Sequence, residues 1–214
     1  GAILVFTIIA FIFKDIVFDV ILLGPQKPDF PTYKALCSIS NFLGLDEALC
    51  MTVSPFSLQN ISMSGQFSAH IMTSVFAGFI VAFPYVFWEF WRFISPALYD
   101  DESKIARGVV FFSSVLFLFG VLFGYYVIAP LSVNFLGSYQ VSSTVANQIS
   151  LTSFISTVTT VSLANGIIFE LPILVYFLTK IGLLTPEFMR MYRKHAMVVT
   201  LILSAIITPP DITS

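Results

Sequence analysis

Charged side chains are scarce in this chain. Only 10% of its residues are Asp, Glu, Lys or Arg, while 57% are hydrophobic; soluble globular domains average about 25% charged residues. Residues 108–179 carry a single charge, on Glu170. This composition excludes a soluble domain and predicts a polytopic membrane protein. The near balance of acids and bases also leaves no basic surface for nucleic acid.

Patterns for catalysis and for metal binding are missing as well. The sequence has no HExxH, G-x-S-x-G, Walker A or dinucleotide-binding pattern. Its two histidines, His70 and His195, lie far apart, and neither cysteine has a His or an acid at ligand spacing. We therefore expect no enzymatic activity, no cofactor and no metal, and we interpret the chain as a binding or transport scaffold.

Five apolar stretches are predicted to be transmembrane helices, because a bilayer core of about 30 Å needs about 20 apolar helical residues. They cover residues 1–13, 69–88, 108–129, 151–179 and 196–207. Pro172 should bend the fourth, since proline removes a backbone donor. The first is short and both ends of the chain look cut, so residues 1–214 are expected to be one integral membrane domain from a longer protein.

Lysine and arginine are shared unevenly among the connections. The predicted loops 89–107 and 180–195 hold seven of the ten basic residues, whereas loop 130–150 holds none. Positively charged loops stay in the cytoplasm. The N-terminus is therefore predicted to be cytoplasmic, and loops 14–68 and 130–150 to lie outside.

The predicted outer loop 14–68 contains both cysteines. Thr32–Ser40 and Asp46–Cys50 are predicted to form short helices between proline and glycine breaks. Cys37 and Cys50 would lie on the side of the membrane where thiols are commonly oxidised, which favours a disulfide between them. Two buried, reduced cysteines are the alternative.

Glu170 is the first candidate functional residue. An acid at the centre of a membrane helix costs roughly 2.5–3.5 kcal/mol on insertion scales, and such residues are usually functional. Residues three or four positions apart share a helix face, so Gly166, Ser162 and Thr159 lie on the side of Glu170. That small, hydroxylated face favours a protein interior or wet cavity over lipid. A structural acid, hydrogen-bonded within the bundle, is the alternative.

The predicted cytoplasmic segment Phe83–Glu102 is the second candidate. It combines an aromatic cluster, a proline turn and three consecutive acids. Acids on a side where basic residues dominate suggest a cationic ligand, because carboxylates accept bidentate guanidinium bonds. A solvated turn, with an acid near the start of the third span, is the alternative. Trp88 and Trp91 are interpreted as interfacial membrane anchors.

Four motifs follow one another between residues 84 and 211. The first comprises Pro84, Tyr85, Phe87–Trp91, Phe93–Tyr99 and Glu102, and the others are Phe169–Pro172, Gly182–Glu187 and Thr208–Asp211. Their order and spacing resemble the TatC family, the multispanning receptors of the twin-arginine protein translocase. The resemblance implies an all-α polytopic bundle of six spans with both termini cytoplasmic. Relative to that pattern the first span is shortened, and the sixth span and an amphipathic N-terminus with a second signal-binding acid are absent.

The resemblance also implies a function and a location. The chain would be a core receptor of the twin-arginine translocation system in the bacterial cytoplasmic (inner) membrane. It would bind Arg-Arg signal peptides of folded proteins and assemble in lipid with single-span TatA/TatB-type subunits, as a homo- or hetero-oligomer. Export would be driven by the proton-motive force.

Individual residues acquire roles through the same resemblance. The residues implied in signal-peptide binding are Glu102, which would pair with the signal arginines, and Phe93, Pro96 and Leu98. The residues implied in the contact with partner helices are Glu170, Thr208, Pro209 and Asp211. The alternative function is a proton-coupled secondary transporter that uses Glu170. It would need inverted repeats and broken helices, of which Pro172 is the one indication.

Overall fold

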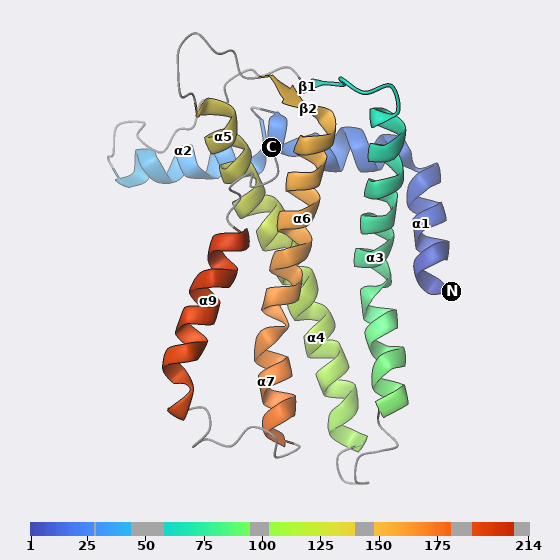
Figure 1. Cartoon of the computed structure of the whole chain (residues 1–214), viewed down its shortest axis with the longest axis vertical. Coiled ribbons are helices and arrows are strands. Elements are labelled where there is room, and N and C mark those ends of the chain that lie inside the picture. The colour runs from blue at the N-terminus through green and yellow to red at the C-terminus, as the bar shows by residue number, and fades with distance from the viewer. Residues whose placement is uncertain (28, 44–57, 95–102, 140–147, 181–189, 208–214) are drawn as a thin grey trace.

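Long helices running side by side make up most of the protein, and helix α2 lies across one end of them (Figure 1). The computed structural model describes residues 1–27, 29–43, 58–94, 103–139, 148–180 and 190–207. The helical elements are α1 (Ala2–Ile12), the π-helix η1 (Ile16–Leu22), the 3₁₀-helix η2 (Gly24–Gln26), α2 (Pro31–Leu43), α3 (Gly65–Ile94), α4 (Ser103–Phe123), the π-helix η5 (Gly124–Ile128), α5 (Ala129–Ser138), α6 (Leu151–Phe169), α7 (Leu171–Lys180) and α9 (Arg193–Ile207). The predicted helical membrane bundle is confirmed.

Three helical segments of the described chain are long and apolar enough to cross a membrane: Gly65–Phe93, Gly108–Gly137 and Leu151–Thr179. They contain the second, third and fourth predicted spans. The first predicted span corresponds to the shorter apolar helix Ala2–Ile12. The fifth lies within α9, whose side chains are exposed wherever they are described, from Arg193 to Ile202.

The helices extend beyond the predicted spans, so the predicted loops were too wide. Helix α3 continues to Ile94 and α4 begins at Ser103, which places both ends of the predicted loop 89–107 in helices. Pro84 lies inside α3, within the span predicted at residues 69–88. Helix α5 fills the first part of the predicted loop 130–150. A helix satisfies its own backbone hydrogen bonds in lipid and in water alike. Charged residues at the edge of the membrane therefore mark the end of the apolar span but not the end of the helix.

The predicted outer loop 14–68 is largely helical too. It contains η1, η2, α2 and the first turn of α3. The helix predicted at Thr32–Ser40 is confirmed within α2. The one predicted at Asp46–Cys50 lies outside the described residues.

Helix α2 is held against the membrane bundle by hydroxyl groups. The Tyr33 hydroxyl lies 2.9 Å from the carbonyl oxygen of Pro25 and 3.3 Å from that of Pro130, and can donate to either. Thr32 donates to the carbonyl of Tyr126. Burial raises the pKa of Tyr33 to about 12, because the charged phenolate is poorly solvated there.

Two short strands join the starts of two membrane helices. β1 (Leu58–Gln59) pairs in parallel with β2 (Ile149–Ser150), with Leu58 opposite Ile149. Helix α6 follows β2 directly, and α3 begins soon after β1. The Ser150 side chain caps α6 by accepting a hydrogen bond from the backbone N–H of Ser153, which satisfies one of the donors left free at a helix start.

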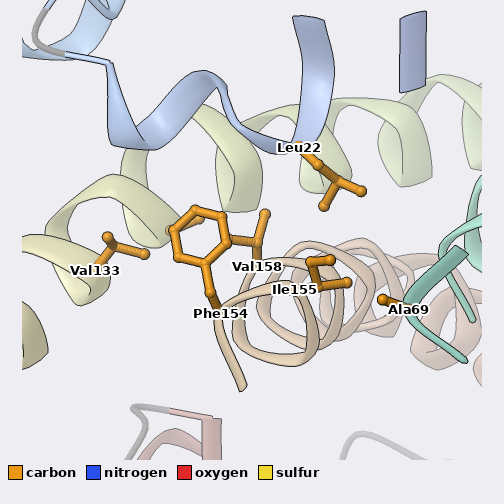
Figure 2. Packing of buried hydrophobic residues seen from close by; sticks show 7 residues of the cluster. Leu22, Ala69, Val133, Phe154, Ile155 and Val158 are labelled. Atoms are coloured by element: carbon orange, nitrogen blue, oxygen red, sulfur yellow. The ribbon is translucent and has the colours of Figure 1, made fainter. Parts of the chain in front are cut away.

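The main apolar cluster lies at the same end of the bundle. Helix α6 supplies its centre, and η1, α3 and α5 surround it (Figure 2). Its buried members are Leu22, Ala69, Ala129, Val133, Phe154, Ile155 and Val158. This packing fixes the first turns of α6, the helix that ends at Phe169 directly before Glu170.

Candidate functional site

Glu170 lies at a break in the fourth span. Helix α6 ends at Phe169 and α7 begins at Leu171. Pro172 has no backbone N–H, and its ring crowds the turn that precedes it. The bend predicted at Pro172 is therefore present, as an interruption centred on Glu170 two residues earlier.

The carboxylate of Glu170 faces helix α4. The hydroxyl of Ser113, which is fully buried, donates to Oε2 of Glu170 over 2.5 Å. The backbone N–H of Phe117 also faces the carboxylate. Oε1 is buried, and among the described residues it has no partner with hydrogen-bond geometry. A buried acceptor without a donor is costly. One half of the carboxylate is thus satisfied by α4, and the other half is open to a further donor.

Glycines allow the two helices of this site to approach closely. A Cβ atom on Gly120 would lie 2.8 Å from the carbonyl oxygen of Asn165, and one on Gly124 would lie 2.8 Å from Cα of Ser162. From the opposite side, a Cβ on Gly166 would lie 2.9 Å from the ring of Phe117. These contacts are shorter than atoms tolerate, so the spacing of α4 and α6 requires glycine at these positions.

The small-residue face predicted beside Glu170 faces this contact. Gly166 and Ser162 are buried there. The hydroxyls of Ser162 and Thr159, however, donate to carbonyls one turn back in their own helix. The polar partner of Glu170 therefore comes from α4, as Ser113, which the sequence reasoning missed. The available signal was a hydroxyl pair, Ser113 and Ser114, within an otherwise aromatic and aliphatic span.

The chemistry of this site is that of a hydrogen-bond acceptor, because it consists of one carboxylate held by one hydroxyl group. Within the described ranges, no three His, Cys, Asp or Glu side chains gather closely enough to hold a metal ion. The geometry fits a polar contact inside a membrane bundle, where one hydrogen bond from another helix is worth about 0.6–2 kcal/mol.

The end of α3 presents the described part of the second candidate segment. Phe93 is 84% exposed there, and the guanidinium of Arg92 lies 5.9 Å from the centroid of the Trp88 ring. Trp91, in contrast, is only 8% exposed and packs edge-on against Phe177 of α7. The interpretation of Trp91 as an interfacial anchor was therefore wrong, because its position on α3 turns it into the bundle. Trp88 is exposed, and its anchoring role stays a prediction.

Several predicted site residues lie outside the described residues: Glu102, Pro96, Leu98, Thr208, Pro209, Asp211 and Cys50. Their roles stay predictions. Cys37, on α2, takes part in a disulfide. Its pairing with Cys50 also stays a prediction.

The family model described as "Sec-independent protein translocase protein (TatC)" matches residues 1–214. The chain belongs to the TatC family. This confirms the resemblance seen in the four motifs.

Individual TatC relatives are similar over different lengths. A TatC protein of Blattabacterium from Periplaneta americana is 41% identical over 214 residues, which is 100% of this chain and 80% of that protein. The TatC protein of Helicobacter pylori strain J99 is 42% identical over 144 residues, which is 67% of this chain and 57% of that protein. A crystal structure of the twin-arginine translocase receptor TatC, in DDM, superposes with a TM-score of 0.65 at 30% identity, covering 97% of this chain and 86% of that one.

Membership of the TatC family decides between the functional classes considered for this sequence. The chain is a Sec-independent protein translocase component and a multi-pass membrane protein. The family is one of translocase components and not of known enzymes. The alternative of a proton-coupled secondary transporter is not favoured.

Proposed function

We propose that this chain is the receptor that captures Arg-Arg signal peptides of folded precursor proteins. The observation that carries the proposal is the match of the TatC family model to the whole chain. A solved relative at 30% identity is described as a twin-arginine translocase receptor. Glu102 is the residue of this chain that would pair with the signal arginines, since carboxylates and guanidinium groups form short, bidentate bonds.

The end of α3 supports a binding surface beside Glu102. Phe93 is 84% exposed, although an aromatic ring of this size is normally packed or in contact with a partner. Three acids follow Phe93 by seven to nine positions in the sequence, and together they would offer a signal peptide an apolar contact and a charge partner. Pro96 and Leu98 would complete this surface.

Glu170 is proposed as the polar contact for single-span TatA/TatB-type subunits. Its Oε1 is buried without a donor, while Oε2 is held by Ser113. A hydroxyl, amide or protonated side chain on a partner helix would satisfy that oxygen. Thr208, Pro209 and Asp211 would belong to the same contact region.

The proposed orientation places the N-terminus in the cytoplasm of a bacterium, with the chain in the inner membrane. The basic residues 92, 104, 107, 180, 190, 193 and 194 are the seven that set it. The end of α3 and the starts of α4 and α9 lie at one end of the bundle (Figure 1), as this orientation requires.

Photocrosslinking tests the capture of the signal peptide. Benzoylphenylalanine replaces Phe93 in one variant and Phe42 in the other. Phe42 is the matched control, because it is 90% exposed but lies on α2 at the opposite end of the bundle. A precursor with an Arg-Arg signal should crosslink at position 93 and not at position 42.

Two further samples make this experiment decisive. A Lys-Lys signal should give a weaker crosslink at position 93, because lysine cannot form the bidentate pair. Glu102→Gln should remove the crosslink, whereas Asp29→Asn, an exposed acid on the outer side, should leave it unchanged. A crosslink that survives Glu102→Gln at full strength would refute the capture model.

A further inference from the structure

A cavity opens where α1 ends and α3 begins. It has a volume of about 470 Å³, within the size range of small-molecule sites. Its polar lining comes from the turn after α1, from η1 and from the first turns of α3. These polar residues are Lys14, Asp15, Asp19, Gln66 and His70.

The charged groups of this cavity are not matched to one another. The ion pair that the described residues contain joins Lys34 to Asp29, and none joins Lys14 to Asp15 or Asp19. The ammonium of Lys27 donates to the backbone carbonyl of Asp19 over 2.8 Å, so the Asp19 carboxylate stays without an ion pair among the described residues. The side chains of Lys14, Asp15 and Asp19 are exposed and can therefore be reached by a ligand. The cavity thus offers one cationic and two anionic groups to a ligand.

Two observations narrow the class of ligand. In the part of the chain that the structure describes, Asp15, Asp19 and His70 do not form a cluster that could hold a metal ion. Nε2 of His70 lies 3.1 Å from the carbonyl oxygen of Phe11 and is already engaged. A ligand that uses all three charged side chains must carry one group for the lysine and another for the acids.

The surroundings of the cavity are apolar and exposed. Phe67, which also lines it, is 62% exposed, and Phe13, Ile16 and Ile71 nearby in the chain are 56%, 54% and 44% exposed. The cavity lies at the end of an apolar helix, where a membrane span meets the headgroup region. Charged groups above exposed aromatic and aliphatic side chains match the two halves of a phospholipid.

We propose that this cavity binds the phosphoethanolamine headgroup of a membrane phospholipid. The ammonium group donates to the carboxylates of Asp15 and Asp19, and the phosphate pairs with Lys14. The acyl chains run down the apolar surface beside Phe67. A choline headgroup has no N–H to donate, and an anionic glycerol headgroup would meet two carboxylates, so both should bind more weakly.

Native mass spectrometry of the detergent-purified protein tests this proposal. The protein is incubated with equal amounts of phosphatidylethanolamine, phosphatidylcholine and phosphatidylglycerol that carry identical acyl chains. Phosphatidylethanolamine should be retained about tenfold better than either competitor, as the loss of one charge-assisted bond predicts. Equal retention of the three lipids, or a preference for phosphatidylglycerol, would overturn the proposal.

Variants locate the binding to the cavity. The double variant Asp15→Asn/Asp19→Asn should lose the preference, and Lys14→Gln should weaken retention of all phosphate-bearing lipids. The matched controls are Asp29→Asn and Lys34→Gln, which remove the same charges from the exposed ion pair outside the cavity. A double variant that keeps the wild-type preference places the lipid elsewhere and refutes this site. If the double variant does not fold, Lys14→Gln still tests the site, because unchanged retention of all three lipids in that variant would place the lipid elsewhere.

Discussion

Replacing Gly120 by alanine should push α4 and α6 apart. The added Cβ would lie 2.8 Å from the carbonyl oxygen of Asn165 and 2.8 Å from Cβ of Phe169. A backbone carbonyl cannot rotate aside as the end of a long side chain can, so the helices themselves must move. Gly108, in the same helix, is the matched control, because nothing lies within 4 Å of a Cβ at that position.

The expected magnitude follows from two opposing terms. Glycine to alanine inside a helix contributes about 1 kcal/mol of stability through helix propensity. Overpacking of a close contact costs about 1–3 kcal/mol. The propensity term is common to Gly108→Ala and Gly120→Ala. The second variant should therefore be about 1–3 kcal/mol less stable than the first.

Denaturant titration in detergent micelles, followed by tryptophan fluorescence, measures this difference. Trp91 packs against Phe177 between α3 and α7 and should report loss of the bundle. Gly108→Ala should be as stable as the unmodified protein or more so. If Gly120→Ala matches Gly108→Ala in stability, α4 and α6 are not in the close contact described here, and the Ser113–Glu170 geometry would lose its support.

Two further predictions concern Glu170 and Tyr33 on helix α2. Glu170→Ala should reduce photocrosslinks to single-span subunits, whereas Ser114→Ala, whose hydroxyl donates within its own helix, should not; unchanged crosslinks in both would make Glu170 a purely structural acid. The pKa of Tyr33 is raised to about 12 by burial, above the ordinary value of about 10, so folding favours the protonated phenol. Its contribution to stability is therefore complete below about pH 10 and is lost as the pH rises towards 12. The midpoint temperature of thermal unfolding, measured between pH 8 and 12, should fall as the pH rises. Tyr33→Phe should make that fall less steep. If both proteins show the same dependence on pH, groups other than Tyr33 cause it.

Much of the membrane architecture could be predicted from the sequence. Apolar length is a strong signal, so the positions of three spans and of the apolar first helix were correct. The ends of the helices were less accurate, because a helix can continue into water. Residues 89–94 were expected to belong to a loop and are helical.

The candidate site was only half predictable for a different reason. Glu170 is conspicuous because it is the one charge in its span, and a charge in lipid is costly. Ser113 is conspicuous only after folding, since serine is common in membrane helices and its partner lies 57 residues away. The burial of Trp91 likewise depends on which face of α3 meets α7. Helical periodicity shows which residues share a face, but not which neighbouring helix that face contacts.

The strand pair between β1 and β2 limits how this bundle can deform. It joins residues just ahead of α3 and α6 through backbone hydrogen bonds. The two helices are therefore held together at the end where they begin. Any separation of α3 from the fourth span must therefore be largest at the opposite end, where Phe93 and α7 lie.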